Sequence, residues 1–274
     1  MVKFKKFVKK NPAFIVYCIL ALAIVLVAVF APLIATHDPY AAVLADAVKA
    51  PSSEHWFGTD KMGRDLFSRV IFGARTSLTA ALCLVAIIVV VGTALGIIAG
   101  YFGGVVDAVI MRLSDMMISF PGMVLAIAVA GILGANIKNA VVAIAIVSWT
   151  KYARLARSLV LKIKNRDYIA AAKVTGSKTG YILWKYMLPN SLPTIVITGA
   201  TDIGSMMLEI AGLSFLGFGA QSPTAEWGLM LNEGRAFMTA APWLMIFPGI
   251  AIFITVVVFN LLGDSLRDVL DPRS

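Results

Sequence analysis

Residues 76–106, TSLTAALCLVAIIVVVGTALGIIAGYFGGVV, contain no charged side chain. A membrane-spanning helix needs about 20 consecutive apolar residues, and this run exceeds that length. The chain of 274 residues is 59% hydrophobic and 14% charged, whereas a soluble domain has about 25% charged residues. This composition disfavours a cytosolic enzyme and a secreted disulfide scaffold. We therefore predict an all-α polytopic membrane protein with one spanning helix from about Ser77 to Ala99.

Five further apolar runs predict spanning helices, which gives six transmembrane helices in total. The first run is too long for a cleaved signal peptide and follows a cluster of lysines. The fourth carries Lys151, Arg154 and Arg157 at one end, and the sixth contains Pro242 and Pro248. The five runs cover about residues 13–35, 105–137, 139–159, 193–216 and 237–262.

The distribution of charge predicts the orientation. Residues 1–10 contain five lysines, and residues 151–190 contain nine basic residues and one acid, whereas residues 36–75 contain five of each sign. Because basic loops stay in the cytoplasm, the first two regions are expected there. Six spans then place both termini in the cytoplasm. The net charge of +9 lies mainly in these two regions, so we do not predict nucleic acid as a partner.

We divide the chain into three parts. Residues 1–75 form an N-terminal cytoplasmic tail, the first helix and an outer loop. Residues 76–264 form a core with five helices and a cytoplasmic loop at 161–190, and residues 265–274 form a cytoplasmic tail.

Glycines recur every four residues at positions 92, 96, 100 and 104, a spacing that lets helices pack closely in lipid. We favour packing within this chain, with a subunit contact as the alternative. The two cysteines, Cys18 and Cys83, are interpreted as small buried hydrophobic residues.

The cytoplasmic loop contains a patterned stretch, DYIAAAKVTGSKTGYILWKYMLPN, over residues 167–190. Three consecutive alanines favour a helix, and Gly176 suits a helix end. A second apolar and aromatic stretch follows, before Pro189 is expected to stop it. The pattern predicts two short helices that meet at Gly176.

This loop resembles the signature of permease subunits in binding-protein-dependent ABC importers. That signature has EAA, three residues, Gly, nine residues and then I-x-L-P. The chain departs from it twice, with Ala170 in place of the Glu and Tyr186 in place of the usual Ile or His. The matching positions are Ala170, Ala171, Ala172, Gly176, Tyr186, Leu188 and Pro189.

Two other stretches resemble the dipeptide, oligopeptide and nickel branch of these importers. Residues 55–65, HWFGTDKMGRD, match an element that follows the first helix in that branch. Residues 213–219, LSFLGFG, and 223–228, PTAEWG, match a second element. The resemblance runs from about residue 12 to 272, which is nearly the whole chain.

The resemblance implies a type I permease fold and a transport subunit that is not an enzyme. It implies a multi-pass protein of the bacterial or archaeal cytoplasmic membrane that forms half of a translocation pathway. The seven matching loop residues would contact an ATPase. Its partners would be a second homologous permease, two ATPases that hold ATP and Mg, an extracytoplasmic substrate-binding protein and membrane lipid. The substrate would be chelated nickel or a di- or oligopeptide, with a slight preference for nickel.

No cofactor or metal site is predicted in the chain itself. Residues 176–179, GSKT, lack the glycine spacing of a P-loop. No Ser/His/Asp constellation is visible. The only histidines, His37 and His55, fall in the outer loop and therefore cannot form a metal path through the membrane.

Two acids lie within the predicted fifth helix. Asp202 and Glu209 are seven residues apart, so they share a helix face, with Ser205 between them and Met206 beside it. Acids in a spanning helix usually face a bundle interior or a wet cavity. These four residues are candidates for the lining of a pathway, and a structural contact between helices is the alternative. An ion-gradient-driven secondary transporter is the alternative function, although such folds often contain inverted repeats, which are not visible here.

Overall fold

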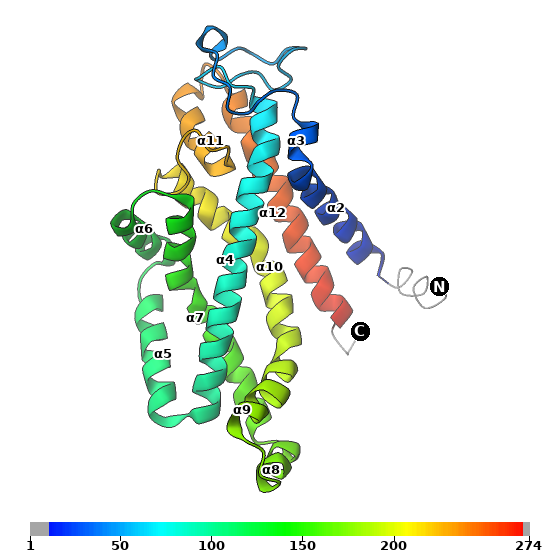
Figure 1. The fold of residues 1–274 in the computed structure, drawn as a ribbon, viewed down its shortest axis with the longest axis vertical. Helices are drawn as coiled ribbons and strands as arrows, with labels where there is room; N and C mark the ends of the chain where they lie inside the picture. Colours follow the sequence, from blue (N-terminus) through cyan, green and yellow to red (C-terminus); the bar gives the residue numbers. More distant parts are fainter. Residues whose placement is uncertain (1–10, 271–274) are drawn as a thin grey trace.

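The structure is a computed structural model that describes residues 11–270. These residues form a bundle of helices without a β-strand (Figure 1). The all-α prediction is therefore confirmed. The lysines of the predicted cytoplasmic N-terminus and the last four residues of the predicted C-terminal tail lie outside the described residues.

The long helices, numbered in chain order, form the bundle, and the short ones lie in its connections. The long helices are α2 (Pro12–Val29), α4 (Leu66–Phe102), α5 (Gly104–Ile118), α6 (Gly122–Leu133), α7 (Ile137–Lys164), α10 (Leu188–Phe215) and α12 (Trp243–Leu270). The short ones are α3 (Ala31–Ile34), η1 (Leu44–Asp46), α8 (Asp167–Val174), α9 (Thr179–Ile182), η2 (Leu183–Met187), α11 (Trp227–Gly234) and η3 (Arg235–Phe237).

The predicted third span is not one straight helix. It is divided into α5 and α6, which meet at 93°. Ser119, Phe120 and Pro121 separate the two helices. The ring of Pro121 disfavours a helical conformation at Phe120, the residue before it. The absence of charge predicted an apolar segment here but not its bend.

The number of spans depends on two of the helices. Within residues 11–270, four helices are long and apolar enough to cross a membrane, and the bent pair gives a fifth if it counts as one span. The helix α7 is 28 residues long, but its second half is rich in Lys and Arg, so it does not meet that standard of hydropathy. The predicted total of six spans is therefore reached only if the bent pair counts as one span and α7 also crosses the membrane.

The boundaries of the other spans also differ from the predicted ones. The helix α4 begins at Leu66, eleven residues before the predicted start, because Asp65 caps it by accepting the Ser68 N–H. The sixth helix begins at Trp243 rather than 237, so Pro242 precedes it and only Pro248 lies inside. The division predicted at 75/76 thus falls within α4.

The glycine repeat forms the seam between α4 and α7. A β-carbon at Gly92 would lie 2.4 Å from the Trp149 carbonyl oxygen, and one at Gly96 would lie 2.3 Å from that of Ala153. Gly100 is also tight, whereas Gly104 has no neighbour within 4 Å. The favoured interpretation, close packing within the chain, is confirmed for the first three glycines.

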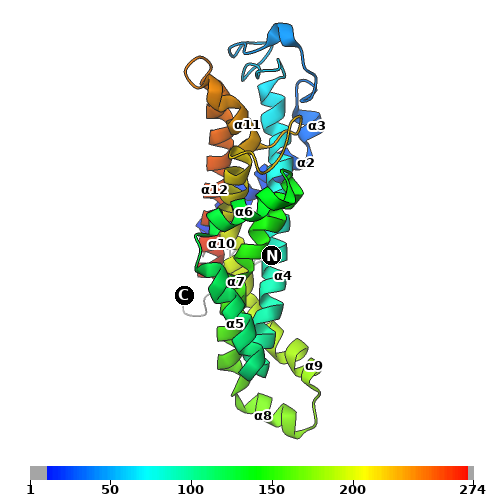
Figure 2. The same cartoon turned by 90° about the vertical axis from the view of Figure 1, so that its left-hand side faces the viewer.

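The bundle has two distinct ends. In Figures 1 and 2, α8 and α9 project from one end, and the segment between α3 and α4 covers the other. The helix α10 packs against α4, α7 and α12 in the interior, while α2 lies against α12 and α4. Functional groups at one end are therefore connected to the other end by long, continuous helices.

Candidate functional site

The loop at 161–190 has the predicted helix–glycine–helix form. The helix α8 ends at Val174, Gly176 has a φ of +79°, and α9 begins at Thr179. The turn is closed by hydrogen bonds that Gly176 N and Ser177 N donate to the Lys173 and Ala172 carbonyls, each 3.0 Å long. A residue with a β-carbon is strained at this φ, which explains why the turn takes glycine.

The loop is held to the bundle by its apolar face. Four of its side chains are buried, and the Lys164 and Lys173 ammonium groups lie 5.8 and 5.7 Å from the centre of the Tyr101 ring at the end of α4. The four buried side chains are Ile169, Ala172, Ile182 and Met187. These contacts fix the direction in which the loop projects.

Other positions of the loop expose large apolar and aromatic side chains. Val174 is 88% exposed and Trp184 is 76% exposed, and two tyrosines accompany them. A soluble surface rarely exposes such side chains together unless they meet a partner. We call Tyr168, Val174, Tyr181 and Trp184 the loop-tip patch.

The structure places the seven predicted contact residues unevenly. Ala172 is buried, Tyr186 and Leu188 are half-buried, and the remaining four are exposed. Pro189 does not end the second helix as predicted. It lies near the start of α10, which follows the π-helical turn η2 directly. The whole segment Thr179–Phe215 is therefore one helical rod.

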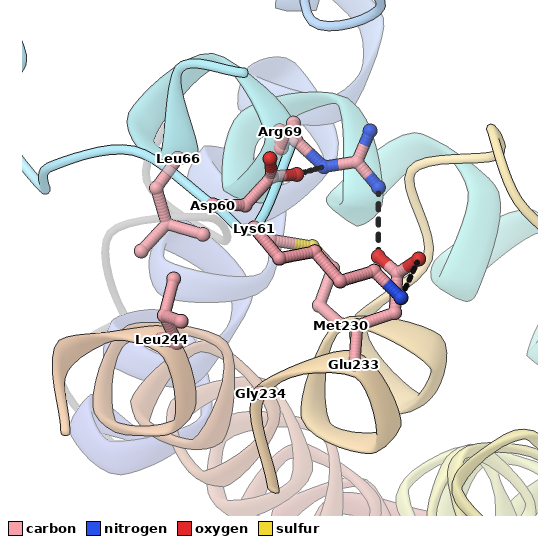
Figure 3. A pocket seen from close by; sticks show the side chains of 8 residues that line it. All are labelled: Asp60, Lys61, Leu66, Arg69, Met230, Glu233, Gly234 and Leu244. Atoms are coloured by element: carbon pink, nitrogen blue, oxygen red, sulfur yellow. Dashed lines mark ion pairs between the residues drawn. The ribbon is translucent and has the colours of Figure 1, made fainter. Parts of the chain in front are cut away.

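At the other end, a buried cluster of charges joins three segments. The Arg69 guanidinium lies 3.3 Å from an Asp60 oxygen and 3.7 Å from a Glu233 oxygen. Arg64 pairs with the same two acids at 2.6 and 3.1 Å. Lys61 reaches Glu233 from the rim at 3.3 Å, and Figure 3 shows this pair together with the two pairs of Arg69. Arg69 also donates to the carbonyls of Pro39, Pro223 and Thr224. This cluster ties the outer loop to α4 and α11.

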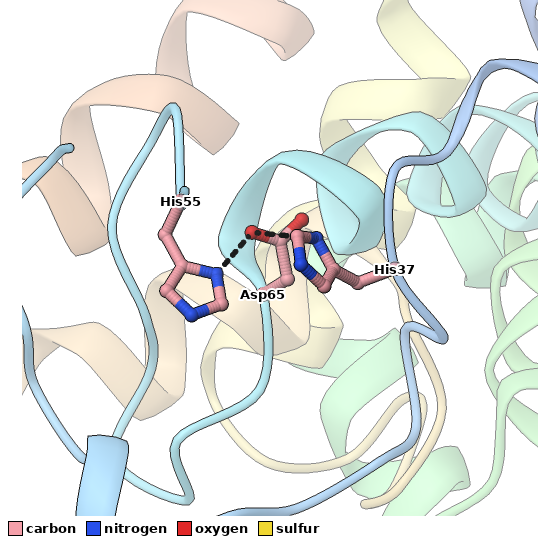
Figure 4. Close-up of side chains that lie close together, drawn as sticks. All are labelled: His37, His55 and Asp65. Atoms are coloured by element: carbon pink, nitrogen blue, oxygen red, sulfur yellow. Dashed lines mark hydrogen bonds and ion pairs between the residues drawn. The ribbon is translucent and has the colours of Figure 1, made fainter. Parts of the chain in front are cut away.

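Two histidines converge on the carboxylate that caps α4. His55 Nδ1 lies 2.9 Å and His37 Nδ1 lies 3.8 Å from Asp65 Oδ1, and the two rings are 4.9 Å apart (Figure 4). The three donor groups lie within 4.8 Å of one another, close enough to hold a metal ion. Asp65 also has a structural role, since its Oδ2 accepts the Ser68 N–H at 2.8 Å. The absence of a metal site stays a prediction.

Glu226 is a buried cap at the start of α11. Its carboxylate accepts the N–H groups of Gly228 and Leu229 at 2.9 and 2.8 Å and the Ser77 hydroxyl at 3.2 Å. Burial raises the pKa of Glu226 above its usual range, although the two backbone N–H groups oppose that shift. The residue joins α11 to α4.

The four candidate pathway residues on α10 do not share one environment. Asp202 and Met206 are buried, Glu209 is half-buried, and Ser205 is exposed. The Lys151 ammonium contacts both Asp202 oxygens at 2.6 and 2.8 Å, and the Tyr152 hydroxyl donates to Asp202 at 2.7 Å. Asp202 therefore makes a polar contact between α7 and α10, and a role in a pathway stays a prediction.

Comparison with known proteins decides the family. Residues 92–274 match the family model of the binding-protein-dependent transport system inner membrane component. The chain belongs to this family. Residues 4–51 also match the N-terminal transmembrane domain of oligopeptide transport permease C. The chain is thus a multi-pass permease subunit of an ABC importer.

The curated relatives of this permease differ in what they transport. It is 44% identical to a dipeptide transport system permease of Alkalihalophilus pseudofirmus, over 98% of this chain and 88% of the relative. It is 48% identical to a glutathione transport system permease of Pectobacterium atrosepticum, over 82% and 75%. It is 38% identical to the nickel transport system permease of Escherichia coli K12, over 92% and 93%.

The fold of the permease also resembles a solved structure. An inward-facing structure of the MetNI methionine ABC transporter matches with a TM-score of 0.60 at 17% sequence identity, over 74% of this chain and 97% of that one. This likeness supports the predicted type I permease fold.

Sequence reasoning missed two groups of interacting residues in this permease. Lys151 was interpreted only as part of a basic region, although it pairs with Asp202 fifty-one positions away. Asp60 and Arg64 belong to one quoted motif, but nothing linked them to Glu233. The only available signal was the presence of several charges at the edges of apolar helices in a chain with few charged residues.

Proposed function

We propose that this permease forms half of a translocation pathway with a second homologous permease and receives ATP-driven motion through its 161–190 loop. Two ATPase subunits would hold the ATP and Mg. The loop-tip patch carries the proposal, because it presents exposed aromatic side chains on a basic projection of the bundle. Exposed aromatic side chains are enriched in protein interfaces, so this patch suits a contact with a partner protein.

The motion would pass along a rigid element. The loop is anchored by the buried Ile182 and Met187, and it continues without a break into α10. A displacement at the loop therefore moves the region of Ser205 and Glu209, where we expect the pathway. The Lys151–Asp202 contact couples the same movement to α7.

We infer the orientation from the basic loop. Residues 151–190 would lie in the cytoplasm with both termini, and the end covered by the segment between α3 and α4 would face the extracytoplasmic binding protein. The ends of α2 and α12 fit this arrangement, since the start of α2 and the end of α12 point to the same side of the bundle (Figure 1).

Replacing Trp184 with Ala is expected to reduce the binding of the ATPase strongly. Large aromatic side chains at the centre of an interface contribute about 2 kcal/mol or more, which is about a thirtyfold change in affinity. The measurement is the amount of ATPase that co-purifies with the tagged permease complex, together with transport in vesicles.

Trp56→Ala is the matched control, because Trp56 is also an exposed tryptophan, 56% exposed, but lies at the opposite end. This variant should keep its ATPase. If Trp184→Ala retained full co-purification and transport, the loop-tip patch would not be the ATPase contact.

We propose short peptides as the substrate class. The support is that identity to the dipeptide and glutathione permeases is higher than identity to the nickel permease, which favours peptides over nickel. A secondary transporter driven by an ion gradient gains no support from these relatives.

The substrate is best tested on the substrate-binding protein of the same importer. Calorimetry is expected to show binding of di- and tripeptides and no binding of Ni²⁺ or its chelates. Tight binding of a nickel chelate without peptide binding would reverse this assignment and leave the permease role intact.

A further inference from the structure

A groove lies between α4 and α7 at the end of the bundle opposite the 161–190 loop. Its volume is about 700 Å³, within the range of about 300–1,000 Å³ that small-molecule sites occupy. Along α4 its wall includes Arg75, Thr79, Cys83 and Ile87, which recur at helical spacing on one face. Cys83 is exposed there and is not the buried residue predicted from the sequence.

The length of the groove matches one leaflet of a bilayer. Arg75 and Ile87 are twelve residues apart, or about 18 Å along a helix that rises 1.5 Å per residue. The hydrocarbon core of a membrane is about 30 Å thick, so the groove extends from near its edge to about its middle. It is therefore long enough for one acyl chain.

The cations of the groove come from both helices, Arg75 from the outer part of α4 and Lys138 from the first turn of α7. Arg75 on α4 and Lys138 on α7 both line it, and both are exposed. Within residues 11–270 neither side chain makes an ion pair or hydrogen bond to another residue, and no carboxylate lines the groove. Cations at the edge of the hydrocarbon core attract anionic groups.

We propose that this groove binds an anionic phospholipid. The phosphate lies between Arg75 and Lys138, and one acyl chain runs along Thr79, Cys83 and Ile87. A free peptide would place its own polar backbone against this apolar wall, which fits the lining less well. This proposal rests on the proposed function only in its choice of membrane leaflet. The orientation inferred there places the groove in the outer leaflet.

The test uses the complete importer complex, delipidated in detergent and titrated with phosphatidylglycerol or phosphatidylcholine under native mass spectrometry. The complex is expected to bind phosphatidylglycerol more tightly than phosphatidylcholine. The double variant Arg75→Gln, Lys138→Gln should bind it about thirtyfold more weakly, since each cation near an anionic lipid contributes about a factor of five. Cys83→Trp should weaken the binding of both lipids, because the larger side chain would fill the path of the acyl chain.

Arg235→Gln is the control, because Arg235 is an exposed cation near the same end of the bundle that does not line the groove. It should leave lipid binding unchanged. Equal binding of the two lipids, or an unchanged affinity in the double variant, would overturn the proposal. So would a complex in which chemical cross-linking places another subunit against Cys83. None of these outcomes bears on ATPase binding, which tests the proposed function separately.

Discussion

Replacing Gly96 with Val is expected to destabilise the folded permease strongly. The new β-carbon would lie 2.3 Å from the Ala153 carbonyl oxygen and 2.8 Å from the Ala156 β-carbon. The first of these neighbours is backbone, so α4 and α7 must separate along their seam. Overpacking of this kind costs about 1–3 kcal/mol and more where the backbone must move. The measurement is the thermal transition of the detergent-solubilised protein, together with its yield as a monodisperse species.

Ala94→Val is the control for this prediction. Ala94 lies two residues away on the exposed face of the same helix, so it receives the same β-branched side chain without a helix partner. Its transition should stay close to that of the wild type. An unchanged transition for Gly96→Val would show that the seam between α4 and α7 is not as close as the structure indicates.

Replacing Arg69 with Met is expected to be the most destabilising change at the end of the bundle opposite the 161–190 loop. Arg69 is fully buried and faces Asp60 and Glu233. Removing one partner of a buried ion pair costs about 3–5 kcal/mol, because a charge remains in an environment of low dielectric. Three backbone carbonyls also lose their donor. Proteolysis of the outer loop and the thermal transition would both report the loss.

Lys61→Gln separates the buried part of the cluster from its rim. The Lys61 side chain is 40% exposed and pairs with Glu233, and exposed ion pairs contribute about 0–1 kcal/mol. We expect little change in the transition of this variant. If Lys61→Gln were as harmful as Arg69→Met, the stabilisation would come from the net charge of the cluster rather than from the buried guanidinium.

The loop at 161–190 could be predicted in detail because its determinants are local. Alanines favour α8, and Gly176 suits a turn with positive φ. The predicted end of the second helix at Pro189 was wrong, because a proline at the start of a helix and a proline after a helix look alike in the sequence. Only the chain that follows, which continues into α10, distinguishes them.

The interactions of charged residues were not predictable in the same way. Lys151 is 51 positions from its partner Asp202. Arg64 is 169 positions from its partner Glu233. No local sequence pattern indicates such a pairing. The outer-end groove is another example, since its lining comes from α4, α7 and the loop before α4.

The sequence by itself determined the all-α membrane architecture, the glycine seam and the helix–glycine–helix loop. Each of these follows from hydrophobicity, residue spacing or backbone conformation within one segment. Only the tertiary structure decided that the third span bends by 93° and that Asp202 pairs with Lys151. It also decided that Arg75 and Lys138, which have no ion pair within residues 11–270, line one apolar groove. These features depend on which helices pack side by side, and packing brings together side chains whose separation along the chain carries no signal.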